Sequence, residues 1–137
     1  MKKLLRYYLP VVLWLLVIFF VPTFFLSKTT IIIPLHLDKA VHVIEFFIFG
    51  YLMNRALYYG ARIPGKKRTF ILMLGIALFI GAIDELYQIY IPGRVASLYD
   101  FSADVAGALC SVGLFTYIIF KKTSPPEADL PPADLQQ

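Results

Sequence analysis

The chain has one cysteine, Cys110, and few charged residues. A single cysteine excludes an intrachain disulfide and cannot assemble a thiolate metal site. Charged residues make up 16% of the 137 residues, whereas hydrophobic residues make up 59%. This leaves too few polar side chains to cover a water-soluble globule of this size. The composition therefore indicates an integral membrane protein with the size of one domain.

A long basic stripe with interleaved aromatic residues, as found in nucleic-acid binders, is also absent. The formal net charge is +4, but the basic residues collect in short segments beside apolar runs. That distribution is typical of membrane topology signals and excludes nucleic acid as the expected partner.

Four apolar runs are long enough for helices that cross a hydrocarbon core of about 30 Å. We expect them near residues 4–26, 38–59, 69–91 and 101–120, separated by a connection at 29–37 and a glycine- and proline-containing loop at 60–68. The first run follows a basic start and has no small-residue cleavage site, so it predicts an uncleaved anchor. The prediction is an all-α bundle of four transmembrane helices in residues 1–122. Residues 123–137 contain four prolines and three acids, which predicts a disordered tail.

The basic residues also predict the orientation of the bundle. Ten lie on the side of the N-terminus, the 60–68 loop and the C-terminus, and three lie opposite: Lys28, Lys39 and Arg94. By the positive-inside rule, both termini are predicted to be cytoplasmic.

Ionisable residues interrupt the apolar runs in two places. In the stretch 84–107, Asp84 and Gln88 share a helical face at i, i+4, and so do Asp100 and Asp104. The turn-like sequence 91–94 lies between the two runs and predicts a hairpin that brings these faces together. Two small-xxx-small pairs, Ala77 with Gly81 and Ala103 with Gly107, predict close helix contacts nearby.

The second place is the start of the second span. Asp38, His42 and Glu45 follow one another at i, i+4 and i+7, which is one helical face, although Asp38 is equally well explained as a helix cap. Acids in a membrane segment require partners or a wet cavity. We therefore expect one outward-opening pocket with Arg94 as its anion anchor, formed by His42, Glu45, Asp84, Gln88, Arg94, Asp100 and Asp104.

At these residues the sequence resembles the VanZ-like family of small membrane proteins, named after a protein associated with teicoplanin resistance. The resemblance lies in two blocks, DKAVHVIEFFIFG at 38–50 and DELYQIYIPGRVASLYDFSADVAG at 84–107. The chain has Asp104 where many relatives carry asparagine. The resemblance implies a role at the outward face of the bacterial cytoplasmic membrane, and the family has no securely established reaction.

Three interpretations of the polar residues remain open. The first is a binding or shielding protein for an envelope lipid, cell-wall precursor or lipid-linked glycan, with ligand-binding residues Asp38, Lys39, Gln88, Arg94, Asp100 and Asp104. The second is an enzyme acting on such a lipid, with catalytic residues His42, Glu45, Asp84 and Glu85. The third is a structural role, in which Lys39, His42 and Arg94 pair with the acids. A divalent cation at Asp84, Asp100 and Asp104 is compatible with oxygen ligation, and the sequence identifies no cofactor.

Overall fold

The structure is a computed structural model that describes residues 2–21, 35–63, 66–92 and 94–123. Within these residues the fold is entirely helical, with short π-helices η1 and η3 and four α-helices: η1 Leu4–Tyr8, α1 Leu9–Val21, α2 Leu35–Arg55, η3 Ala56–Gly60, α3 Lys66–Gln88 and α4 Leu98–Thr123. Four helical segments are long and apolar enough to cross a membrane: Leu4–Val21, Leu37–Gly60, Lys67–Gln88 and Leu98–Ile119. The predicted all-α fold with four helices of spanning length is confirmed.

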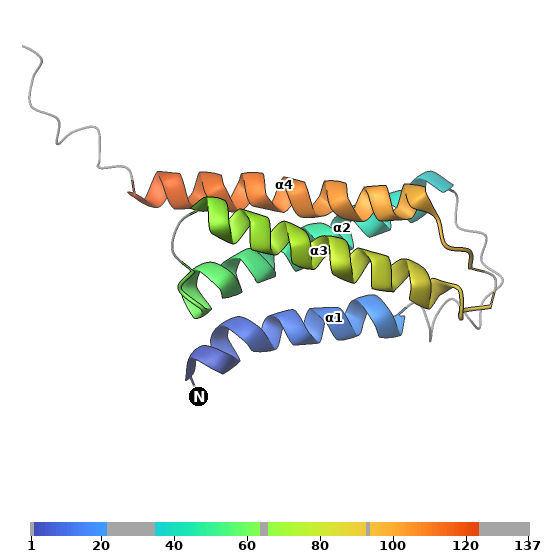
Figure 1. The fold of residues 1–137 in the computed structure, drawn as a ribbon, viewed down its shortest axis with the longest axis horizontal. Helices are drawn as coiled ribbons and strands as arrows, with labels where there is room; N and C mark the ends of the chain where they lie inside the picture. The colour runs from blue at the N-terminus through green and yellow to red at the C-terminus, as the bar shows by residue number, and fades with distance from the viewer. Residues whose placement is uncertain (1, 22–34, 64–65, 93, 124–137) are drawn as a thin grey trace, which may run out of the picture.

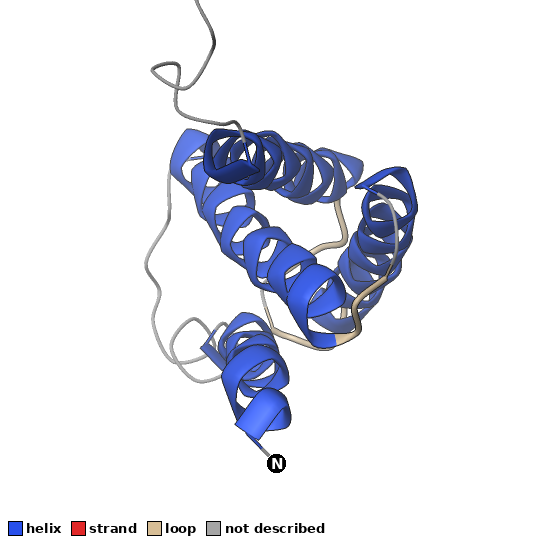
Figure 2. Ribbon diagram, turned by 90° about the vertical axis from the view of Figure 1, so that its left-hand side faces the viewer, coloured by secondary structure: helices blue, strands red, loops and turns tan. Residues whose placement is uncertain are grey.

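The helices lie side by side, with α1 along the lower edge and α4 along the upper edge of Figure 1. Figure 2 shows that α1 stands outside the group formed by the other three helices. The most extensive helix contact joins α2 to α4, whereas α1 touches α2 and α3. One hydrogen bond sets the position of α1 along the axis of α2, because the Trp14 indole donates to the backbone carbonyl of Glu45 at 2.9 Å.

Small residues allow α2 and α4 to approach closely. A Cβ atom on Gly107 would lie 2.2 Å from the backbone oxygen of Val43, and one on Gly50 would lie 2.3 Å from the Ser111 hydroxyl. In lipid, where no hydrophobic driving force separates protein from solvent, such close backbone packing is a main source of helix association. The predicted close contact at Gly107 is therefore present.

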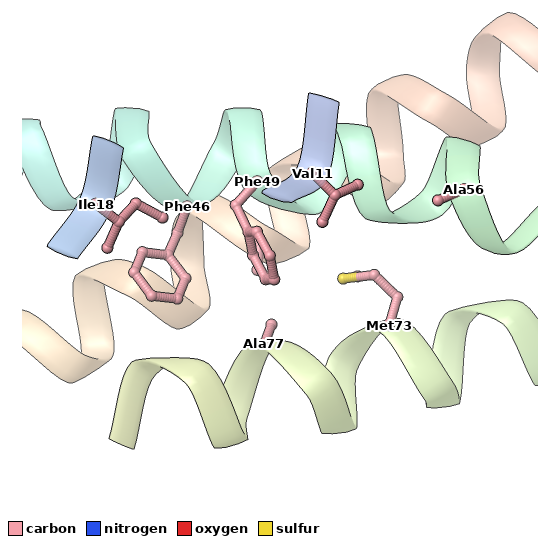
Figure 3. Close-up of a cluster of buried hydrophobic side chains, with 8 residues drawn as sticks. Val11, Ile18, Phe46, Phe49, Ala56, Met73 and Ala77 are labelled. Carbon is pink, nitrogen blue, oxygen red and sulfur yellow. The ribbon is translucent and has the colours of Figure 1, made fainter. Parts of the chain in front are cut away.

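An apolar core fills the other side of α2. Figure 3 shows Phe46 and Phe49 reaching from α2 toward Met73 and Ala77 on α3. The two phenyl rings meet edge to face at 5.8 Å, a favoured geometry for aromatic pairs. Ile18 and Val11 from α1 complete this cluster. Many large apolar side chains are instead exposed on the outside of the bundle, among them Leu13, Phe20 and Phe79, where a membrane would surround them.

Two helix ends differ from the predicted spans because of local hydrogen bonding. Helix α4 begins at Leu98 and not near 101, since the Ser97 hydroxyl accepts the backbone N–H of Tyr99 at 3.2 Å and caps the first turn. Helix α3 ends at Gln88 and not near 91. There, the N–H of Ile91 bonds to the Gln88 carbonyl and tightens the chain into a turn.

Other boundaries shift by a few residues. Helix α2 already begins at Leu35, so Asp38 lies inside its first turn, and α3 begins at Lys66, which shortens the predicted 60–68 loop. Helix α4 continues through Thr123, which had been predicted to begin the tail. The predictions for residues 22–26, 29–34 and 124–137 lie outside the described residues.

We expect Gly107→Ala to destabilise the protein by about 2–3 kcal/mol, because an added methyl group in a filled contact has no space and its neighbour here is backbone. Thermal unfolding of the purified protein in detergent measures this. Gly113→Ala on the same helix is the control, since a Cβ there would meet nothing within 4 Å. Equal melting temperatures for the two variants would contradict the close α2–α4 approach.

Candidate functional site

Charged and amide side chains gather at one end of the bundle, where α2 begins, α3 ends and α4 begins. We call this set the polar cluster: Asp38, Lys39, His42, Asp84, Glu85, Gln88, Arg94, Asp100 and Asp104. Six of its members are buried: His42, Asp84, Glu85, Gln88, Asp100 and Asp104. Helices far apart in sequence thus bring the predicted polar residues together.

His42 lies at the centre of the polar cluster. Its Nδ1 atom is 2.9 Å from Oδ1 of Asp104 and 4.0 Å from Oδ2 of Asp84. Its Nε2 atom is 3.4 Å from Nη2 of Arg94. Arginine has only donor groups, so this contact requires a lone pair on Nε2. The contact is a hydrogen bond only in the tautomer that carries its proton on Nδ1, in which His42 donates to Asp104.

Two cations form the partly exposed rim of the polar cluster. Arg94 donates from Nη1 to Oδ1 of Asp38 at 2.8 Å, and Lys39 pairs with Asp100 and, at 3.5 Å, with Asp38. The side chains of Arg94 and Lys39 are 20% and 25% exposed, whereas that of His42 is 3% exposed. The polar cluster is therefore exposed at Arg94, Lys39 and their partner Asp38, which is 19% exposed. These pairs are also the contacts that a structural role requires.

The acids of α3 are held by neutral groups. The Gln88 amide donates to Oδ2 of Asp84 at 2.8 Å, one helical turn away, as their spacing predicts. Oε2 of Glu85 accepts the backbone N–H of Ser97 at 2.6 Å. This role of Ser97 was not predicted. The Ser-x-x-Asp pattern at 97–100 marks Ser97 as a helix cap, but no side-chain pattern marks its backbone N–H as the partner of Glu85.

Four buried polar atoms of the polar cluster have no hydrogen-bond partner among the described residues. They are three acceptors and one donor: Oε1 of Glu85, Oε1 of Gln88, Oδ2 of Asp104 and Nε of Arg94. Because an unsatisfied buried polar group costs about 1–3 kcal/mol, such groups are satisfied by ordered water, an ion or a ligand.

Two groups of side chains have the composition of a metal site. Ligand atoms of His42, Asp84, Glu85 and Asp104 lie within 4.8 Å of one another, and so do those of Asp38, His42 and Asp100. The predicted trio Asp84, Asp100 and Asp104 is thus divided between the two groups. An imidazole with several carboxylates is a ligand set that suits divalent cations.

Glu45 lies beside the polar cluster, within electrostatic range of His42 and Asp84, but is not hydrogen-bonded to it. Its side chain forms no hydrogen bond or ion pair within the part of the chain that the structure describes, and it belongs to neither metal-like group. It lies on the predicted face of α2, but about 4.5 Å deeper than His42 at 1.5 Å per residue. The rim residue Arg94 contacts His42 and Asp38 and not Glu45.

Comparison with protein-family models, curated proteins and solved structures finds no match to this chain. The VanZ-like resemblance stays a prediction.

We expect a strong energetic coupling between His42 and Asp104. Each single alanine variant leaves a buried polar partner behind and should cost about 3 kcal/mol or more. The double variant should cost less than the sum by about 1–3 kcal/mol. Unfolding of the four proteins in detergent gives the coupling energy. Ser102→Ala, at an exposed residue of α4, should add to His42→Ala without coupling, and additivity for Asp104 as well would contradict the pair.

Proposed function

We propose that this protein is a multi-pass protein of the bacterial cytoplasmic membrane, similar to the VanZ-like family, whose polar cluster binds the polar head of an envelope lipid or lipid-linked glycan. Both termini are cytoplasmic in this proposal, and the polar cluster opens outward. The observation that carries it is the set of four unpartnered atoms on Glu85, Gln88, Arg94 and Asp104.

A purely structural role of the polar cluster, as a lock between the helices, explains fewer of its buried acids. Such a lock needs each buried charge to have a partner, because burial of an unpaired charge opposes folding. Arg94, Lys39 and His42 already have carboxylate partners in Asp38, Asp100 and Asp104. Asp84 and Glu85 are additional buried acids, each held by a neutral group. Two acids beyond the requirement of the lock support a binding role.

The unpartnered atoms also indicate the chemistry of the ligand. Three of the four are hydrogen-bond acceptors, so a complementary group donates hydrogen bonds, as hydroxyl and ammonium groups do. Arg94 supplies one donor, and its guanidinium is otherwise paired with Asp38. A sugar or glycerol headgroup fits this pattern better than a bare phosphate. Arg94 is therefore one contact of a wider site and not the sole anchor.

A link with glycopeptide susceptibility is part of this proposal. The resemblance to VanZ-like proteins supports it, and so does the class of ligand, since a headgroup held in the polar cluster is shielded from a large molecule at the membrane surface. Teicoplanin susceptibility of a bacterial host is the phenotype to measure.

Catalysis on the same lipid is a second candidate function. The observation that favours it is the contact between His42 and Asp104 at 2.9 Å, because a carboxylate that orients an imidazole is a common arrangement for proton transfer. Lipid extracts distinguish the two. A composition that changes only with intact His42 supports catalysis, whereas lipid retention without a change supports binding.

We expect Glu85→Gln to reduce the lipid that co-purifies with the protein by about 10-fold, since hydrogen bonds to charged groups contribute about 1.5–3 kcal/mol. The glutamine oxygen keeps the bond from Ser97, and its amide nitrogen then presents a donor where the carboxylate presented an acceptor. Mass spectrometry of lipid extracted from protein purified in mild detergent measures the loss.

Glu45→Gln is the comparison variant, because it removes the same charge from a neighbouring carboxyl that is not hydrogen-bonded to the polar cluster. It should retain the lipid of the unaltered protein. Full retention by Glu85→Gln would overturn the proposal, and loss in Glu45→Gln alone would move the site deeper along α2.

The proposed orientation predicts the location of reporter fusions. Fusions after Lys67 and after Lys122 should be cytoplasmic, and one near Arg94 should be external, because most basic residues stay on the cytoplasmic side. Activity of alkaline phosphatase and fluorescence of a cytoplasmic reporter give opposite patterns for the two sides. The reverse pattern would reject the orientation and place the polar cluster inside.

A further inference from the structure

The opposite end of the bundle carries a second concentration of charge. An open pocket of about 460 Å³ lies between the N-terminal helical segment and the end of η3. Four basic residues line it: Lys2, Lys3, Arg6 and Arg62. Within the described residues none of the four forms an ion pair with an acid, in contrast to Lys39 and Arg94 at the other end. The pocket therefore holds positive charge that no acid among residues 2–21, 35–63, 66–92 and 94–123 pairs with.

Tyrosine rings support the basic side chains of this pocket. Tyr7, Tyr58 and Tyr59 also line it, with the Tyr7 and Tyr59 rings stacked at 6.1 Å. The guanidinium groups of Arg6 and Arg55 lie 5.6 and 5.5 Å from the centre of the Tyr7 ring. These cation–π contacts stabilise both arginines next to the same aromatic ring. Arg55 also donates to the carbonyl of Arg6 at 3.5 Å, which joins η1 to the end of α2.

The backbone at Arg62 is unusual. Its φ angle is 55°, and it is the residue other than glycine with positive φ in the described part of the chain. Glycine adopts such a conformation without steric cost, whereas arginine does not. This conformation closes the end of η3, where the N–H of Ile63 donates to the Leu57 carbonyl at 3.1 Å, and the exposed Arg62 side chain is one of those that line the pocket.

The depth of the pocket matches a lipid headgroup. One spanning segment begins beside the pocket, at Leu4, and another ends beside it, at Gly60. Tyrosines and basic residues at the end of a span lie at the level of the headgroups, and basic pockets between helices bind anionic headgroups. We propose that this pocket binds the phosphate headgroup of an anionic phospholipid. The proposal is independent of the function of the polar cluster, which lies at the other end of the helices.

The test is native mass spectrometry of the full chain in mild detergent, titrated with phosphatidylglycerol or with phosphatidylcholine of the same acyl chains. The unaltered protein should bind phosphatidylglycerol preferentially. The double variant Arg6→Gln/Arg62→Gln should bind it about 10-fold more weakly, because two charges beside the phosphate are removed. The double variant Lys67→Gln/Arg68→Gln removes two exposed charges outside the pocket and should bind as the unaltered protein does.

If both double variants lost phosphatidylglycerol binding equally, general charge attraction and not the pocket would explain the binding. The absence of a preference for phosphatidylglycerol over phosphatidylcholine would also overturn the proposal. Displacement of the lipid by inorganic phosphate at matched concentration would show that phosphate alone is recognised and would overturn the lipid as ligand.

Arg62→Gly separates binding from folding. Glycine relieves the strained φ, so the melting temperature should stay equal or rise, while the preference for phosphatidylglycerol should fall. A glycine variant that keeps the full preference would overturn the role of Arg62 and with it the proposed pocket.

Discussion

The hydrogen bond between His42 and Asp104 joins α2 to α4 in the buried interior, where an unpaired polar side chain costs free energy of folding. Both side chains are almost fully buried, with exposed fractions of 2% and 0%. Because an isolated charge in this environment opposes folding, the position of each further polar group depends on this pair. Asp84 approaches the same imidazole nitrogen, and Arg94 approaches the other one. The rim pairs with Asp38 and Asp100 then enclose the centre.

A glycine on α4 allows the two helices to come close enough for the bond between His42 and Asp104. Gly107 lies one helical turn from Asp104, and its missing Cβ lets α4 meet the backbone of α2 at Val43. A larger residue would push the helices apart by more than the length tolerance of a hydrogen bond. The small residues thus set the separation of α2 and α4, and this separation lets His42 and Asp104 form their hydrogen bond.

Much of this arrangement is predictable from the spacing of residues. The i, i+4 relation of Asp84 and Gln88 predicts the bond that the structure contains, and the hairpin at Pro92 predicts that α3 and α4 present their acids to each other. The spacing does not give depth along a helix, which is why Glu45 shares a face with His42 without a hydrogen bond to the polar cluster. Nor does it identify the partner of Glu85. That partner is a backbone N–H of Ser97, a group that every residue except proline carries.

The order of the partners along the chain has a consequence for biosynthesis. His42 meets Asp104 across 62 residues, Lys39 meets Asp100 across 61, and Arg94 meets Asp38 across 56. The N-terminal partners are therefore translated well before α4 exists. Until α4 has been made, the polar face of α2 therefore lacks the partners that it has in the folded protein. Completion of the polar cluster is thus a late step that depends on the C-terminal half of the chain.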